Sequence, residues 1–423
     1  MAAQQVVLAR ECEYRVEIGA QSELKLKLKS GSAELFGVEL AIDHEYTLRD
    51  KKLAVFTWYG CTLEVSGPAP DVAYSSEETP MSSYLNIHSQ LQRRRELSVV
   101  KRSAGPRVLV AGPVDAGKST LTQILLNYAL RLGEKPTFVD LDVGQGSLSV
   151  PGTIAASPLD MNSISVEEEF VLTNPLVYFF GHASMSENSE LFRHQLQQLA
   201  STVKRRMASD AEVNASGCVI NTCGWVDGLG YDLLVESINA FEVDVVLVIG
   251  QDRLFSRLQS SLSSTDPNLS IVKLARSGGV YFYGAHSLAL AVPTHSPCIT
   301  EVSFDEVDFF AFKDMKVSDV MLPVGQTEDK LDRLRVVKLE KTQELTHSIA
   351  AVAHAKRTQD REAASTSSFA STADHSWLLG SPAAGFVFIK EVREDEKKLV
   401  LLVPSPGPLP SRNLILGSIK WIE

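Results

Sequence analysis

The sequence predicts an α/β protein: a central P-loop domain with a doubly wound parallel sheet, an N-terminal β-sandwich before it and a small C-terminal α+β domain after it. Three observations predict this order. Residues 1–97 alternate polar and apolar positions, residues 112–119 fit a phosphate-loop motif, and apolar strands alternate with helical segments from there to about residue 295. A chain of 423 residues is too long for one ordinary domain, and we place the domains at 1–97, 98–295 and 296–423.

The first domain is predicted from its period-2 segments, which run over residues 13–18, 24–28 and 53–58 with turn-forming residues between them. Residues 84–97 change to helical spacing and end in a charge run that contains Arg93, Arg94 and Arg95. We interpret this segment as a linker helix. Its arginines could contact RNA, but a solvated helix face is the favoured interpretation.

The motif at residues 112–119 reads Gly-Pro-Val-Asp-Ala-Gly-Lys-Ser and fits G-x-x-x-x-G-K-[ST] at every fixed position. An apolar strand over 107–111 precedes it and a helix over 120–130 follows it, so a chance glycine-rich turn is disfavoured. The loop N–H groups and the helix N-terminus would bind an anion. Lys118 would reach the β- and γ-phosphates and the Ser119 hydroxyl would ligate Mg²⁺. We therefore expect a bound nucleoside triphosphate.

The doubly wound sheet is predicted from apolar strands at 137–141, 218–222 and 243–249, which alternate with helices at 190–208 and 231–241. Ligands of such sheets bind at the carboxyl ends of the strands. Asp140 and Asp142 lie at one of these ends, where a carboxylate can hold Mg²⁺ or act as a base toward a hydroxyl. We favour Asp142, because the glycines after it would direct its side chain to the phosphate end of the sheet.

Two further loops follow predicted strands of this sheet. Trp225 lies in a glycine-flanked loop after residues 218–222, where it could stack on a base or pack the loop onto the core, and the residues alone leave both open. Ser277, Gly278 and Gly279 follow an apolar segment at 270–274 and are typical of a loop that approaches a ligand.

Composition excludes several classes of protein. The formal charge is −11 (41 basic and 52 acidic residues), which argues against a surface covered in nucleic-acid-binding charge. The five cysteines form no C-x-x-C pair, so we expect no zinc site or disulfide framework, and a reducing compartment. We expect no secretory signal and no membrane span, because no apolar run approaches the roughly 20 residues that a span requires.

The third domain has its clearest strands at 385–389 and 399–403. Residues 357–376 are rich in Ser, Thr, Ala and charge, and we expect a mobile surface loop there.

Several motifs together resemble the eukaryotic polyribonucleotide 5′-hydroxyl kinases, which are subunits of the pre-mRNA cleavage complex II and associate with the tRNA-splicing endonuclease. The resemblance covers nearly the whole chain. Its motifs are the phosphate loop, Leu-Asp-Val-Gly-Gln-Gly at 141–146, Ile-Asn-Thr-Cys-Gly-Trp-Val at 220–226, Ser-Gly-Gly-Val at 277–280, and shorter matches at 33–37, 56–61 and 404–410.

The resemblance implies ATP and Mg²⁺ as cofactors, an RNA with a 5′-hydroxyl as substrate, and a nuclear location. The implied partners are a cleavage factor II subunit and the tRNA-splicing endonuclease complex. It implies that Lys118 and Asp142 are catalytic, that Ser119 and Asp142 bind the metal, and that Trp225 stacks on an RNA base. The implied nucleotide-binding residues are Glu13, Phe36 and Lys52 against the adenine, and Gly112, Asp115, Ala116, Gly117, Lys118, Ser119 and Thr120 in the loop.

One departure from the family pattern bears on activity. The family carries a basic lid between Ser-Gly-Gly-Val and Tyr-Phe-Tyr-Gly, whereas here residues 277–280 continue directly into 281–284. An arginine at the transferring phosphate can be worth roughly 10³–10⁵ in rate. Arg276 and Arg131 are candidates to replace the lid arginines. In addition, Gly250 stands where the family tends to have Asp.

Two functions are therefore in competition. The first is ATP-dependent phosphorylation of RNA 5′-hydroxyl ends, and the alternative is a catalytically weak ATP-binding scaffold subunit of the pre-mRNA cleavage complex. A GTPase of the same class is disfavoured, because the sequence has no Asn-Lys-x-Asp loop for guanine.

Overall fold

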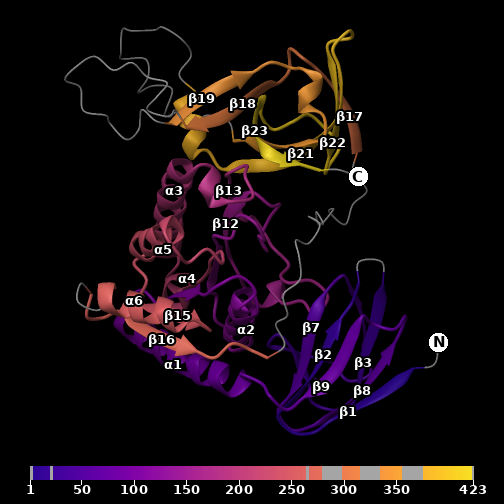
Figure 1. The fold of residues 1–423 in the computed structure, drawn as a ribbon, viewed down its shortest axis with the longest axis vertical. Coiled ribbons are helices and arrows are strands. Elements are labelled where there is room, and N and C mark those ends of the chain that lie inside the picture. Colours follow the sequence, from indigo (N-terminus) through magenta and orange to yellow (C-terminus); the bar gives the residue numbers. More distant parts are fainter. Residues whose placement is uncertain are drawn as a thin grey trace.

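The computed structural model describes residues 3–19, 22–262, 266–278, 298–314, 334–354 and 375–421. A sandwich, a central α/β domain and a C-terminal β domain follow one another along the long axis (Figure 1). The predicted order of the domains is confirmed, and so are the N-terminal β-sandwich and the central α/β domain with its parallel strands. The boundary placed at residue 97 falls inside a helix, the boundary at 295 lies outside the described residues, and both stay predictions.

Two antiparallel sheets form the sandwich, with strand orders β1–β8–β3–β6 and β5–β4–β7–β2–β9. Successive side chains of a strand point to opposite faces of its sheet, so every second residue enters the core of the sandwich. In β3, Leu24, Leu26 and Leu28 are buried, and the lysines between them are not. The strands are β1 (Gln4–Leu8), β2 (Cys12–Glu17), β3 (Glu23–Gly31), β4 (Glu34–Leu35), β5 (Val38–Glu39), β6 (Glu45–Arg49), β7 (Lys52–Thr57), β8 (Cys61–Ser66) and β9 (Val72–Ser76).

Helix α1 (Met81–Lys101) joins the sandwich to the central domain. Leu91, Arg95 and Ser98 recur at helical spacing on its buried side. Arg95 is 1% exposed, and its Nε donates to the carbonyl of Ser216 at 3.0 Å. The predicted solvated face is therefore wrong for Arg95, and so is a contact of this arginine with RNA. Arg94 forms an ion pair with Asp244.

The central sheet has the order β13–β12–β11–β14–β10–β15–β16. The five strands from β11 to β16 in this order are parallel, and β12 and β13 add an antiparallel edge that we did not predict. The strands are β10 (Arg107–Ala111), β11 (Thr137–Asp140), β12 (Thr153–Pro158), β13 (Leu176–Phe179), β14 (Cys218–Asn221), β15 (Val245–Ile249) and β16 (Ser270–Leu274). The carboxyl ends of the parallel strands lie at one edge of the sheet. The phosphate loop and the loops that follow β11, β14 and β16 begin at this edge.

Helices cover both faces of this sheet, as a doubly wound fold requires (Figure 1). Helices α1 and α2 (Lys118–Arg131) bury Leu91 and Leu125 against one face. The opposite face is covered by α3 (Ser189–Ala208), α5 (Leu229–Ala240) and α6 (Asp252–Leu262), and α4 (Ala211–Ser216) packs against α1 and α3. Short 3-10 helices η1 (Met161–Ser163) and η2 (Met185–Glu187) interrupt the loops.

The described part of the C-terminal domain is one sheet of order β17–β22–β21–β20–β23–β18–β19 with two 3-10 helices. The strands are β17 (Cys298–Ser303), β18 (Asp308–Asp314), β19 (Leu334–Leu339), β20 (Ser348–Ala353), β21 (Ala383–Arg393), β22 (Lys398–Val403) and β23 (Asn413–Lys420), and the helices are η5 (Gln343–Leu345) and η6 (Ser376–Gly380). Figure 1 shows this sheet above β13 and α3. Of the predicted loop at 357–376, only residues 375 and 376 are described.

Across the part of the chain that the structure describes, we find no helix with the length and apolarity needed to cross a membrane.

Candidate nucleotide-binding site

The phosphate loop leaves β10 and returns as α2, as its motif predicted. Asp115 and Gly117 take positive φ angles of 55° and 91°, and Gly117 caps α2. Such angles favour glycine and are tolerated by aspartate. They turn the backbone so that the loop surrounds the N-terminus of α2, where unpaired N–H groups and the helix dipole attract an anion.

Lys118 lies within this loop. Its side chain is 7% exposed, and its Nζ donates to the carbonyl of Pro113 at 2.9 Å. Burial lowers the pKa of Lys118, and the nearby carboxylates of Asp142 and Asp115 oppose this shift. A buried cation that has lost its hydrating water is stabilised by a negative charge beside it. The loop is therefore suited to a phosphate group.

The two aspartates after β11 have different environments. Asp140 is 2% exposed and accepts from Ser147 N–H at 2.6 Å, Asp142 N–H at 3.1 Å and Asn221 Nδ2 at 3.1 Å. Burial raises the pKa of Asp140 to about 7, and the neighbouring charge of Asp142 adds to this rise. Asp142 instead lines the pocket, while its Oδ1 accepts from the N–H groups of Gly144 and Gln145. Asp142 is thus the carboxylate that faces the ligand space.

A chain of contacts links Asp140 to the loop. Asn221 ends the neighbouring strand, directly opposite Asp140 in the parallel register. Its Nδ2 also lies 3.4 Å from the Ser119 hydroxyl, and its buried Oδ1 has no partner. Asp140 therefore fixes the end of the sheet beneath Ser119.

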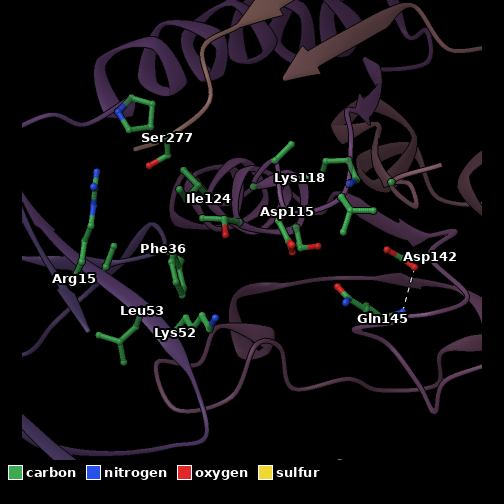
Figure 2. A pocket seen from close by; sticks show the side chains of 18 of the residues that line it. Arg15, Phe36, Lys52, Leu53, Asp115, Lys118, Ile124, Asp142, Gln145 and Ser277 are labelled. Atoms are coloured by element: carbon green, nitrogen blue, oxygen red, sulfur yellow. Dashed lines mark hydrogen bonds between the residues drawn. The ribbon is translucent and has the colours of Figure 1, made fainter. Parts of the chain in front are cut away.

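A single pocket of about 910 Å³ joins these groups to the sandwich. All three predicted adenine-contacting residues line it: Glu13 from β2, Phe36 after β4 and Lys52 from β7. Glu13 is buried and paired with Arg15, and Lys52 is paired with Glu17. Figure 2 shows the sandwich residues on one side of this space and the β11 loop on the other, with the phosphate loop between them.

The far end of the pocket is lined by Asp142, Gln145, Trp225 and residues 183–185. Trp225 is half-buried, and its indole lies against Gly230, where an added Cβ would stand 2.6 Å from the ring. One part of the ring therefore packs on the protein while the residue still borders the pocket. The two alternatives left open for Trp225 are compatible with each other.

The other predicted site residues are placed as follows. Asp115, Ala116, Gly117, Ser119 and Thr120 line the pocket; Gly112 does not, but packs against Ile249, whose carbonyl oxygen would lie 2.9 Å from an added Cβ. Ser277 lines the pocket as well. Gly279 and residues 280–284, on which the missing lid was argued, lie outside the described residues.

The two arginines proposed to replace the lid lie in different places. Arg131 ends α2 at the opposite end from the phosphate loop, about 20 Å away for a helix of this length, and is paired with Glu34 and Glu39. Its suggested role is therefore wrong. Arg276 lies beside Gly250 at the carboxyl end of β15, 3.1 Å from the position of an added Cβ.

Several lining residues had no signal in the sequence. Arg15 reaches the pocket from β2 and donates to the carbonyl of Glu78 at 2.6 Å. Tyr84 contributes from the first turns of α1, and Met185 from η2. Alternation along β2 identifies Arg15 only as a strand residue, and the residues around Met185 carry no motif.

Taken together, the doubly wound sheet, the loop at the end of β10 and the long pocket define a P-loop protein of the nucleotide-binding class. Comparison with family models is more specific. Residues 7–98 match the N-terminal beta-sandwich domain of polyadenylation factor, residues 112–287 match the P-loop of the mRNA cleavage and polyadenylation factor CLP1, and residues 296–423 match the pre-mRNA cleavage complex II protein Clp1. The chain belongs to the Clp1 family.

Relatives resemble the chain over nearly its full length. It is 39% identical to the protein CLP1 homolog of Arabidopsis thaliana, with 99% of this chain and 94% of that protein covered. It is 36% identical to the polyribonucleotide 5′-hydroxyl-kinase Clp1 of Homo sapiens, with 98% and 96% covered. A solved complex of Clp1p with Pcf11p matches with a TM-score of 0.79 and 27% identity, covering 100% of this chain and 99% of that one. A second solved structure, which addresses the Pcf11p–Clp1p interface and ATP loss in a point mutant, has the same TM-score of 0.79 and 26% identity, with the same coverage.

Proposed function

We propose that this chain is a polyribonucleotide 5′-hydroxyl kinase that transfers the γ-phosphate of ATP to the 5′-hydroxyl of an RNA. One observation carries the proposal. A single pocket runs from the sandwich, past the phosphate loop, to a second end lined by Asp142 and Trp225. A nucleoside triphosphate fills the first part, and its γ-phosphate then points into a space large enough for an acceptor.

Each residue has a role in this arrangement. The sandwich residues Glu13, Phe36 and Lys52 contact the adenine, and the backbone of residues 112–120 holds the phosphates. Lys118 neutralises charge on the β- and γ-phosphates as it develops in the transition state. Asp142 accepts the proton of the RNA 5′-hydroxyl, or orients that hydroxyl for attack in line with the leaving oxygen. Trp225 stacks on the terminal base.

The donor set at the loop fits Mg²⁺. Ser119 and Asp142, which both line the pocket, offer a hydroxyl and a carboxylate, and hard oxygen ligands suit this ion. Within the described ranges no three His, Cys, Asp or Glu residues gather into a metal cluster. One or two protein oxygens plus substrate phosphates are the usual Mg²⁺ ligands at nucleotide sites. When bound there, Mg²⁺ supplies charge neutralisation for the transferring phosphate.

The proposed setting is RNA processing in the nucleus. The human relative is named a polyribonucleotide 5′-hydroxyl-kinase, and a protein named Clp1p has been solved in complex with Pcf11p. We propose that this chain likewise binds a cleavage factor II subunit, and that it serves the tRNA-splicing endonuclease complex as well.

One feature of the sequence supports a second function. Residues 277–284 read Ser-Gly-Gly-Val-Tyr-Phe-Tyr-Gly without an intervening basic segment. A chain without lid arginines binds ATP but transfers its phosphate slowly, which suits a scaffold subunit of the cleavage complex.

One assay decides between the two functions: transfer of labelled γ-phosphate from ATP to a 5′-hydroxyl single-stranded RNA, measured beside ATP binding. We expect labelled RNA from the wild type, none from Lys118→Ala, and wild-type transfer from Lys101→Ala, which removes an exposed lysine at the end of α1. Retained ATP binding without any transfer by the wild type would contradict the kinase and leave the scaffold.

A further inference from the structure

The segment of residues 181–187, which follows β13, forms one wall of the far end of the pocket. Ala183, Ser184 and Met185 line this end together with Asp142 and Trp225. The segment also lies against the β11 loop, because a Cβ added at Gly144 would stand 3.2 Å from the carbonyl oxygen of Ala183. Any displacement of the segment therefore changes both the width of the acceptor space and the surroundings of Asp142.

Strand β23 of the C-terminal domain holds this segment directly. The backbone N–H of Ser418 donates to the carbonyl of Gly181 at 2.7 Å. The two glycines at the crossing are in close contact, since a Cβ added at Gly417 would lie 1.9 Å from the Gly181 oxygen. A side chain larger than hydrogen at residue 417 therefore cannot be accommodated without separating β23 from this segment.

Side chains extend the contact along the segment. The Ser418 hydroxyl lies 2.9 Å from His182 Nδ1 and donates to Glu187 Oε2 at 3.1 Å. His182 Nδ1 also lies 3.3 Å from Glu187 Oε2. Ser418 thus bridges the first and last parts of the wall, on either side of the three residues that face the pocket.

The central domain holds the segment from the other side. The carbonyl of Gly152 accepts from the N–H groups of Phe180 and Gly181, each at 2.8 Å. Ile419 of β23 packs onto Gly152, where an added Cβ would lie 2.1 Å from Ile419 Cδ1. The wall is thus enclosed between the start of β12 and the last strand of the chain.

We propose that β23 sets the position of residues 181–187, so that the RNA-acceptor end of the pocket is built jointly by the central and C-terminal domains, with Ser418 as a positioning residue. This proposal rests on the proposed function, because it assumes that the far end of the pocket receives the 5′ end of an RNA. The nucleotide end is lined by the sandwich, α1 and the phosphate loop. A change at the β23 contact therefore alters RNA affinity much more than ATP affinity.

The test compares two glycine-to-alanine substitutions in the same sheet. Gly417→Ala places a methyl group against Gly181, whereas Gly385→Ala adds the same group on β21 where nothing lies within 4 Å. Neither glycine has a positive φ, so the backbone tolerates alanine at both. Binding of a fluorescein-labelled 5′-hydroxyl oligoribonucleotide is followed by anisotropy, which needs no turnover, and ATP binding is measured in parallel.

We expect Gly417→Ala to weaken RNA binding about 10-fold, the size of effect that loss of base stacking on an aromatic ring produces, because the displaced segment borders the same end of the pocket as Trp225. The ATP Kd should stay within about twofold of wild type. Ser418→Ala, which removes only the side-chain bonds, shifts RNA binding in the same direction by less. Gly385→Ala leaves both affinities at wild-type values.

A purely structural contact gives a different result. Unchanged RNA binding in Gly417→Ala beside a lowered melting temperature would overturn the proposal, as would an equal loss of RNA and ATP affinity. Failure of the proposed function is recognised separately, because it appears in the wild type as absent phosphate transfer. A wild type that binds no RNA overturns both.

Discussion

The phenol of Tyr128, on the helix that follows the phosphate loop, donates a hydrogen bond to the buried carboxylate of Glu34 in the sandwich. Arg131 donates to the second oxygen of the same carboxylate at 3.1 Å. Burial raises the pKa of Glu34, and its two donors act against this rise. Glu34 also lines the pocket. These hydrogen bonds therefore hold the sandwich against α2, and the two together enclose the proposed nucleotide site.

Glu34→Gln is expected to lower the free energy of unfolding by about 1–3 kcal/mol, because the charged partner Arg131 and the phenol lose a matched acceptor in a buried site. ATP binding should weaken with it, since the sandwich side of the pocket is no longer held against α2. Calorimetric melting and ATP titration measure the two effects. Glu39→Gln is the control, because Glu39 pairs with the same arginine at an exposed site and such pairs contribute less than about 1 kcal/mol. Equal effects of the two substitutions would argue against an inter-domain role for Glu34.

Asp142→Asn is expected to reduce kcat by about 10²–10⁴, the usual contribution of general base catalysis, while the protein stays folded. The amide oxygen can still accept from Gly144 and Gln145, so the loop keeps its shape. Asp140→Asn is the contrasting variant: an amide group there faces donors from Ser147 and Asn221, and we expect a loss of about 1–3 kcal/mol in stability. Single-turnover transfer and thermal melting separate the two. An Asp142→Asn enzyme with wild-type kcat would exclude Asp142 as the base.

Trp225→Ala is expected to raise the KM for RNA about 10-fold, because stacking of a base on an aromatic ring is worth about 1–3 kcal/mol. Trp225→Phe should recover most of this loss, since a π-face remains. Gly230→Ala places a methyl group against the indole. This should displace the ring and give a KM between those of the wild type and Trp225→Ala. Steady-state kinetics with varied RNA at saturating ATP is the measurement. If the alanine and phenylalanine variants behave alike, Trp225 serves only to pack its loop.

His88 on α1 predicts a pH dependence of stability. Its ring lies 5.2 Å from that of Tyr128. Burial lowers the pKa of His88 to about 4, and the positive charges of Arg95 and Arg131 add to this effect. Because the folded-state pKa lies below the usual value near 6.5, protonation favours the unfolded chain. The stability that this group contributes is present above about pH 6.5 and is lost as the pH falls toward 4, by up to about 1.4 kcal/mol per pH unit.

His88→Leu should remove this part of the pH dependence, whereas His44→Leu, at an exposed position, should keep it. Denaturant unfolding at a series of pH values from 7 to 4.5 tests the difference. Parallel curves for wild type and His88→Leu would show that another group is responsible.

The parts of the fold that local patterns encode could be predicted from the sequence. The phosphate loop depends on a short run of backbone conformations, and its motif placed Lys118 and Ser119 correctly in the pocket. Strands with clear apolar runs were also found, as β10 and β15 show. Asp142 was preferred over Asp140 from the glycines that follow it, and Asp142 is the one that lines the pocket. The catalytic and binding roles themselves stay predictions.

What depends on tertiary contacts could not be predicted. Arg95 stands in a charge run, but the register of α1 places it over the carbonyl of Ser216. Arg131 follows the phosphate loop closely in sequence, yet the length of α2 carries it far from the phosphates. The antiparallel strands β12 and β13 carry no distinct period, and the segment 181–187 is held by contacts with Gly152 and β23, which are distant from it in sequence.

The docking of α1 has a kinetic consequence. Between the sandwich and the central domain the chain runs through α1, a helix anchored by Leu91 and by the buried Arg95, and not through a flexible tether. The two sides of the nucleotide pocket are therefore preorganised, and little further ordering accompanies binding. We expect a bound nucleotide to leave without the two domains separating. We therefore expect a long residence time, so that the chain keeps its nucleotide through many encounters with RNA and partners.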